Sequence, residues 1–135
     1  MFPVEMIIKL LLAVALGILV GTEREISHKP AGLRTHALVS LGACLFTMVS
    51  IYYFDADPAR IAAGIVTGIG FVGAGSIIAS KGHVQGITTA ASLWCVAAIG
   101  MAIGVGAYVL ATVSVVLIFI ILWLKRAESK INKRY

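Results

Sequence analysis

The chain has 135 residues, of which 60% are hydrophobic and 13% charged, with a formal net charge of +5 and a mean hydropathy of +1.02. Soluble domains are far less apolar, so the composition excludes a soluble globular protein and predicts a protein embedded in the bilayer. Nucleic-acid binding is also excluded: five of the eleven cations lie in the last eleven residues, where they act as a topology signal.

The longest uncharged run, Gly82–Leu124, has 43 residues. As one helix it would reach roughly 65 Å, twice the ~30 Å hydrocarbon core, so it must fold back on itself. We predict an all-α bundle of about five transmembrane helices with glycine-rich packing, formed by residues 1–124 and followed by a basic cytoplasmic tail, 125–135. The expected spans are 4–22, 36–54, 59–79, 88–103 and 107–124.

In the first span, Ala13, Gly17, Gly21 and Glu25 recur every four residues. They form one stripe if the helix continues past the span, and Glu25 then points into the bundle. An ionisable group facing inward near a membrane indicates function. Lys9 lies close to the chain's start and is expected to extend to the surface.

The segment between the first two spans holds most of the polar chemistry. Its candidate residues are Glu23, Arg24, Glu25, Arg34, Thr35 and His36. The two carboxylates are hard oxygen donors suited to Mg²⁺ or protons, so Glu23 and Glu25 are the candidate metal ligands. The arginines suit phosphate or carboxylate, and Thr35 is a plausible N-cap of the second span. The alternative is a set of surface ion pairs with lipid headgroup contacts.

The third span begins at Asp57, a candidate N-cap, and Pro58, which suits the first helical position. Arg60 could pair with Asp55 or Asp57. A cation site made by the two aspartates is the weaker alternative.

Glycines are concentrated in the third span. Gly64, Gly68 and Gly75 fall on one helical face, and such small faces let helices approach closely in lipid. Gly70 and Gly73 point away from that face. Two interpretations stay open: neighbours contact both faces, or the helix is bent or unwound between 68 and 75 and exposes carbonyls to an ion.

The fourth span begins after Gly86, with Thr88 or Thr89 as its cap. Trp94 lies too deep for an interfacial anchor and is expected to pack against glycine faces. Cys95, like Cys44, is expected to behave as a small apolar residue without a disulfide. A glycine turn at 104–106 then connects the fourth and fifth spans.

The distribution of lysine and arginine predicts the orientation. Nine cations lie on one side, at positions 24, 29, 34, 81, 125, 126, 130, 133 and 134, and two on the other, at positions 9 and 60. The positive-inside rule then places the N-terminus outside, and the C-terminus and the 23–36 segment in the cytoplasm.

Four blocks of the sequence, in this order along the chain, resemble the MgtC/SapB family of membrane domains. They are Glu23-Arg24-Glu25 with 31–36 and 38–43, then 57–62, then Gly68–Gly75, and finally Gly86–Trp94. The resemblance covers about residues 10–106. It places the family's functional positions in the 23–36 segment and at Thr88–Cys95. Some relatives have Asn at the position of Thr88, so a role that needs the amide does not transfer.

The resemblance implies a bacterial or archaeal cytoplasmic-membrane protein. The family is linked to growth at low magnesium, to survival of pathogens inside host cells and to restraint of the F-type ATP synthase; magnesium transport has also been suggested. Many members add a cytoplasmic domain similar to ACT-type ligand-binding domains. Only eleven residues follow Leu124 here, so we expect no function carried by such a domain.

Three hypotheses follow. The first is a non-enzymatic regulator that forms homo-oligomers through its glycine faces and modulates a membrane partner or ion balance. The sequence establishes no cofactor for it, and Mg²⁺ is the candidate. The second is a cation transporter for Mg²⁺ or H⁺, with Glu23, Glu25 and Gly68–Gly75 forming the path. Transport usually needs polar groups through the whole membrane depth, which these spans lack. The third, an enzyme acting on lipid headgroups through His28, His36 and Glu25, lacks any diagnostic motif.

Overall fold

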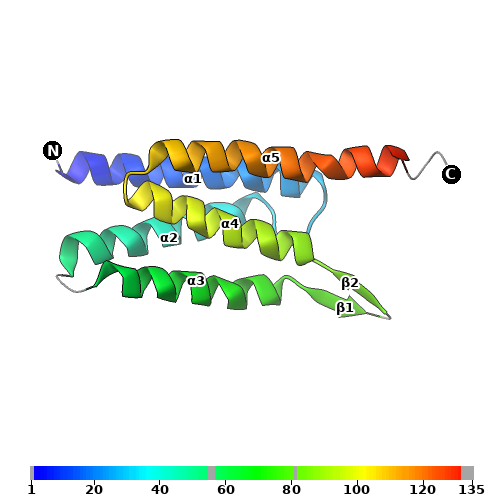
Figure 1. Cartoon of the computed structure of the whole chain (residues 1–135), viewed down its shortest axis with the longest axis horizontal. Coiled ribbons are helices and arrows are strands. Elements are labelled where there is room, and N and C mark those ends of the chain that lie inside the picture. Colours follow the sequence, from blue (N-terminus) through cyan, green and yellow to red (C-terminus); the bar gives the residue numbers. More distant parts are fainter. Residues whose placement is uncertain (1, 55–56, 81, 132–135) are drawn as a thin grey trace.

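The computed structural model describes residues 2–54, 57–80 and 82–131. Five helices cross the molecule in alternating directions, so the first helix begins and the last helix ends at opposite ends of the bundle (Figure 1). The elements are α1 (Phe2–Ile26), α2 (Leu33–Tyr53), α3 (Pro58–Gly75), β1 (Ile78–Ser80), β2 (His83–Gln85), α4 (Ile87–Gly104) and α5 (Tyr108–Ile131).

The predicted all-α bundle is confirmed, with differences at the element ends. Helices α1 to α4 are long and apolar enough to cross a membrane. The apolar part of α5, Tyr108–Leu124, is shorter, about 26 Å at the helical rise, and the helix continues to Ile131. The last helix therefore continues beyond Leu124, where the predicted transmembrane domain ends. Residues 132–135 of the predicted tail lie outside the described residues.

A short antiparallel ribbon joins α3 to α4, where the sequence had suggested that the third span continues to Ala79. Helix α3 instead ends at Gly75, and Ile78 in β1 pairs with Gln85 in β2. The hydrophobic residues Ile77 and Ile78 extended the apolar run, but Ile77 lies in the connection after α3 and Ile78 begins β1. This ribbon projects from the end of the bundle that also carries the α1–α2 loop (Figure 1).

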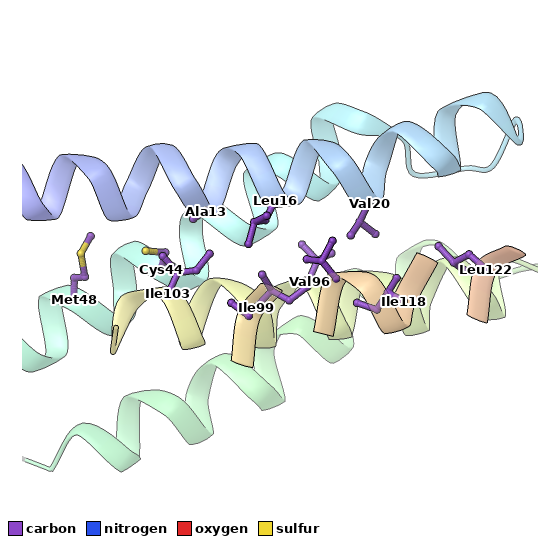
Figure 2. Packing of buried hydrophobic residues seen from close by; sticks show 12 residues of the cluster. Ala13, Leu16, Val20, Cys44, Met48, Val96, Ile99, Ile103, Ile118 and Leu122 are labelled. Carbon is purple, nitrogen blue, oxygen red and sulfur yellow. The ribbon is translucent and has the colours of Figure 1, made fainter. Parts of the chain in front are cut away.

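Helix α4 is the centre of the bundle and contacts all four other helices. Within the apolar 18-residue stretch of α4, 56% of the residues are buried, whereas only 11% are buried in the corresponding stretch of α3 at the edge of the bundle. The core joins side chains from α1, α2, α4 and α5 (Figure 2). Its buried members include Ala13, Leu16, Val20, Cys44, Met48, Val96, Ile99, Ile103, Ile118 and Leu122. Cys44 and Cys95 are both free.

Glycines on α1 and α4 let the backbones touch. A Cβ on Gly17 would lie 2.7 Å from the carbonyl oxygen of His36, and one on Gly21 would lie 2.5 Å from the Cα of Leu33. A Cβ on Gly100 would meet the carbonyl oxygen of Ser40 at 2.2 Å. Because no Cβ fits at these distances, the predicted packing role of Gly17 and Gly21 is confirmed.

Helix α3 uses its glycines differently. A Cβ on Gly64, Gly68, Gly70 or Gly75 would meet nothing within 4 Å, whereas one on Gly73 would lie 3.5 Å from the Cβ of Ala90. This face, predicted to pack in the bundle or in a dimer, is therefore open within the chain, and the contact with α4 lies at Gly73. The helix is continuous from Pro58 to Gly75, so the hypothesis of an unwound segment is wrong.

Candidate functional site

The end of α1 is closed by a turn that positions the polar residues. The amide of Lys29 donates to the carbonyl of Arg24 (3.0 Å) and that of His28 to the carbonyl of Glu25 (3.0 Å). This bond pair is a Schellman motif, which needs a residue of positive φ after the helix; His28 supplies it at φ 52. Helix α1 therefore runs to Ile26, past the expected span, and carries Glu23, Arg24 and Glu25 on its last turn.

Glu25 faces outward, not into the bundle. Its side chain is exposed, and its Oε2 accepts a hydrogen bond from the amide of Leu33 (3.1 Å). The stripe that starts at Ala13 faces α2 at Gly17 and Gly21, and at Glu25 it has reached the first residues of α2 and the loop before it. The predicted inward orientation is wrong: Glu25 satisfies a free amide at the start of α2, and a charge there suits the helix dipole.

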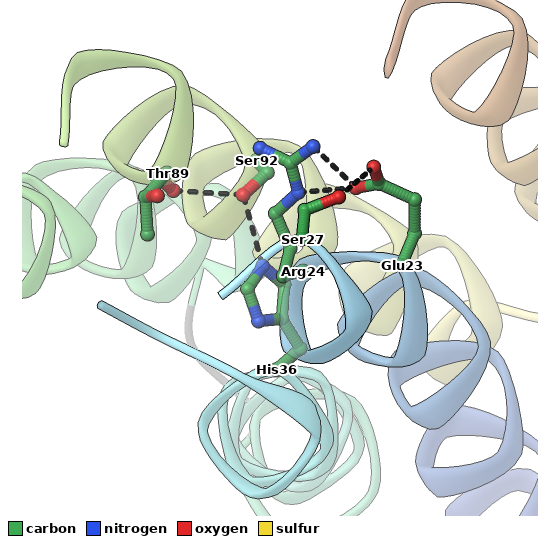
Figure 3. A network of polar contacts seen from close by, with 6 residues as sticks. All are labelled: Glu23, Arg24, Ser27, His36, Thr89 and Ser92. Atoms are coloured by element: carbon green, nitrogen blue, oxygen red, sulfur yellow. Dashed lines mark hydrogen bonds and ion pairs between the residues drawn. The ribbon is translucent and has the colours of Figure 1, made fainter. Parts of the chain in front are cut away.

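Arg24 is the buried charge of this cluster. Arg24 is 1% exposed. Its guanidinium forms an ion pair with Glu23, in which Nε donates to Oε2. The other carboxylate oxygen of Glu23 accepts from the hydroxyl of Ser27 (2.8 Å). Figure 3 shows these three side chains together at the end of α1. A buried guanidinium needs such pairing because an unpaired buried charge is very costly.

His36 joins α2 to α4. It is fully buried, with Nδ1 2.9 Å from the carbonyl oxygen of Gly32 and Nε2 2.9 Å from the hydroxyl of Ser92. That hydroxyl donates to the carbonyl of Thr89 (2.8 Å), as Figure 3 shows. The Nδ1 contact to a carbonyl requires an N–H there, so Nε2 of the neutral ring is an acceptor. The single proton of the Ser92 hydroxyl then serves either Nε2 or the Thr89 carbonyl, but not both at once.

Two predicted helix caps are wrong. The N-cap of α2 is Gly32, and Thr35 lies inside the helix. The N-cap of α4 is Gly86 at φ 92, and neither Thr88 nor Thr89 caps it. A Cβ on Gly86 would lie 2.0 Å from the carbonyl oxygen of Ser76. Close contact with the end of α3 thus requires glycine at the N-cap position. A threonine side chain at that position would clash with the Ser76 backbone.

The remaining candidates on α2 and α4 do not join the cluster. Arg34 and Thr88 are exposed. Trp94 is 52% exposed and borders a shallow cavity between α3 and α4, so its predicted burial against glycine faces is wrong. Cys95 is half-buried and packs against the main core.

Asp57 and Arg60 lie at the other end of the bundle. The predicted cap is confirmed, because Asp57 Oδ1 accepts from the amide of Ala59 (3.0 Å) and Pro58 follows it. The structure shows no ion pair between Asp57 and Arg60 among the residues it describes. The proposed pairing with Asp55, and the aspartate cation site, lie outside the described residues.

Sequence reasoning missed a polar contact inside the bundle. Lys9 is 4% exposed; its Nζ lies 3.1 Å from the hydroxyl of Tyr52 and 3.1 Å from Glu5 Oε1. The ammonium also lies 5.5 Å from the centre of the Tyr52 ring, within cation–π range. The predicted extension of Lys9 to the surface is therefore wrong. Its i, i+4 spacing from Glu5 was the available signal.

The two candidate magnesium ligands are already engaged. Glu23 accepts from Arg24 and Ser27, and Glu25 from the amide of Leu33. Among the described residues, no group of three or more His, Cys, Asp or Glu side chains could hold a metal ion. These residues therefore do not fit a resident Mg²⁺.

The apolar helices and the buried polar contacts at the end of the bundle define a multi-pass α-helical membrane protein. The MgtC family model matches residues 10–131, and the chain belongs to the MgtC family. It is 45% identical over 127 residues to "Putative magnesium transporter YhiD" of Escherichia coli K12, covering 87% of this chain and 59% of that protein.

Two further relatives carry the family's name. Protein MgtC of Salmonella typhimurium is 44% identical over 134 residues, which is 98% of this chain and 57% of that protein. Protein MgtC of Brucella abortus is 48% identical over 107 residues, 78% of this chain and 45% of that protein. The chain thus spans about three fifths or less of the length of these relatives. No solved structure matches it.

Proposed function

We propose that this protein is a non-enzymatic regulator in magnesium homeostasis, acting on a partner in the cytoplasmic membrane of a bacterium or archaeon. The name of the YhiD relative connects that protein with magnesium. The F-type ATP synthase is the candidate partner that the family resemblance implies. In this proposal the protein acts by helix contact inside the bilayer, and no reaction is catalysed.

The open glycine face of α3 is the observation that carries the proposal. Inside the bundle, the space beside glycines such as Gly17 and Gly100 is occupied by the backbone of a neighbouring helix. Gly64 and Gly68 on α3 have the same small surface with nothing within 4 Å. They border an apolar groove of about 480 Å³ between α2 and α3, with Phe46 on its other side. Small surfaces drive helix association in lipid, so this groove suits a transmembrane helix of the partner.

Transport is the competing function, and the polar residues of α2 are its best support. His36, Ser40, Thr47 and Ser50 are all buried, and their spacing places them along one helical face. Between Ser40 and Thr47, about 10 Å along the axis, that face carries the apolar residues Ala43 and Cys44. Helix α3 is continuous, so only the carbonyls of its last turn lack partners within the helix and none is exposed by unwinding along its length. The row is thus interrupted, which favours regulation over ion conduction.

Photo-crosslinking in native membranes tests the proposed groove. A photoreactive phenylalanine analogue replaces Phe46, 60% exposed in the groove, and in the control it replaces Val116, 54% exposed on α5. We expect a discrete crosslink to another membrane protein at position 46 and none at 116. Crosslinking at 46 only to a second copy makes the groove an oligomer interface, and equal crosslinking at both positions contradicts a specific docking site.

Flux measurements separate regulation from transport. The protein is reconstituted into sealed liposomes, and Mg²⁺ and H⁺ entry are followed with fluorescent indicators. We expect no flux above protein-free vesicles. Saturable Mg²⁺ flux would overturn the regulator proposal, and its loss in Glu25→Gln would place the exposed carboxylate at the end of α1 on the path.

A further inference from the structure

A cavity of about 560 Å³ lies at the loop end of the bundle and has no part in the proposed function. It is enclosed by the end of α1, the ribbon, the start of α4 and the end of α5. Its polar wall carries Arg24, Lys29 and Thr89, and its apolar wall carries Ile121 and Leu122. The wall thus combines charge on one side with hydrocarbon on the other.

The charged groups of this wall have one sign. Arg24 and Lys29 are cations, and no carboxylate is among the described residues that line the cavity. Glu23 borders a separate cavity between α1 and α5. It binds Arg24 through Nε and Nη2, and Figure 3 shows the third guanidinium nitrogen pointing away from it. A guanidinium has five N–H donors, so Arg24 retains donors for a second anion.

The start of α4 adds backbone donors to the same wall. Gly86, Ile87, Thr88 and Thr89 all line the cavity, and no side chain caps this helix. The first amides of a helix have no partner within it, and the helix dipole favours an anion beside them. Because the Ser76 backbone blocks any side chain at Gly86, the N-cap residue itself cannot carry a capping side chain.

An unpartnered hydroxyl is the independent sign of a ligand. Thr89 is 1% exposed, and its Oγ1 has no hydrogen-bond partner among the described residues. Burying a hydroxyl without a partner is costly. A ligand oxygen in the cavity would accept from it, beside the first amides of α4, which have no partner within the helix.

We propose that this cavity binds the phosphate group of an anionic ligand, between Arg24, Lys29 and the α4 N-terminus with Thr89. Phosphate suits these donors because arginine and helix N-termini both bind its oxygens well. The group belongs either to a phospholipid headgroup, whose acyl chains then contact Ile121 and Leu122, or to free phosphate. This site goes beyond the proposed regulatory function and does not depend on it.

Binding is measured on the purified protein in detergent. Native mass spectrometry compares phosphatidylglycerol with diacylglycerol, which lacks the phosphate, and calorimetry titrates inorganic phosphate. We expect retained phosphatidylglycerol and little diacylglycerol. Binding of phosphatidylglycerol alone assigns the site to a headgroup, and binding of inorganic phosphate as well assigns it to phosphate as such. No preference for either phosphate compound overturns the proposal.

Variants tie the binding to this cavity. Thr89→Val removes the hydroxyl at nearly constant volume and is expected to weaken binding about tenfold, as for a hydrogen bond to a charged group. The control is Thr112→Val, since Thr112 is exposed on α5 and its hydroxyl bonds within its own helix. Lys29→Gln is the second variant, in case Thr89→Val does not fold. Unchanged affinity in a folded variant of either kind places the binding elsewhere and overturns the proposal.

Discussion

The imidazole of His36 lies 2.9 Å from the hydroxyl of Ser92, fifty-six residues later in the chain. This contact joins the first turn of α2 to the second turn of α4 and lies inside the bundle, where both side chains are buried. It connects two of the four sequence blocks that resemble the family. A buried polar link of this kind determines how the two helices are aligned along their axes.

We expect this link to stabilise the bundle modestly. His36→Ala and Ser92→Ala should each lower the free energy of unfolding by about 1–3 kcal/mol, since each leaves a buried polar partner. The double variant should reveal a coupling of roughly 0.6–1.7 kcal/mol, the range for hydrogen bonds between membrane helices. Unfolding in mixed micelles measures all three. Thr112→Val, on the exposed face of α5, is the control; strictly additive losses would show that the two side chains do not interact.

Two glycines should respond oppositely to alanine. Gly100→Ala places a Cβ 2.2 Å from the Ser40 carbonyl oxygen, so α2 and α4 must separate at a cost of about 1–3 kcal/mol. Gly68→Ala meets nothing within 4 Å and should stabilise helix α3 by up to ~1 kcal/mol. Thermal denaturation in detergent measures both. Equal losses would mean that the α3 face is packed within the single chain.

The buried Lys9 should tolerate an apolar replacement. Lys9→Met keeps most of the volume and removes a buried charge, and such exchanges are often neutral or stabilising. Tyr52→Phe keeps the charge but removes its hydroxyl partner, so we expect a loss of about 1–2 kcal/mol. Melting temperatures of the two variants make the comparison. If Lys9→Met is the less stable variant, the ammonium contributes more than it costs.

Cysteine labelling in intact cells tests the predicted orientation. The background carries Cys44→Ala and Cys95→Ala, and single cysteines replace His28 and Val105, both exposed in turns at opposite ends of the bundle. A membrane-impermeant maleimide should label position 105 directly and position 28 only after the cells are opened. The reverse pattern would contradict the positive-inside assignment.

Much of the bundle could be predicted because the signals are local. Hydrophobic length predicted the helices, and Asp57-Pro58 predicted the start of α3 through its own cap. Gly106, at φ 86, ends the α4 turn as the glycine pattern suggested. The ribbon was missed because the apolar residues Ile77 and Ile78 prolong the hydrophobic run, and hydropathy does not distinguish a strand from a helix end.

The sequence by itself determined that this protein lies in a membrane, how many helices it forms, and which glycines of α1 approach a neighbouring helix. These features follow from apolar length and residue spacing, which are properties of each segment alone. Only the tertiary structure decided which charge is buried. Arg24 is buried and Glu25 exposed although both lie on the last turn of α1, and the partner of His36 is supplied by α4. Helix periodicity states which residues share a face, but the packing of the other helices decides which face is covered.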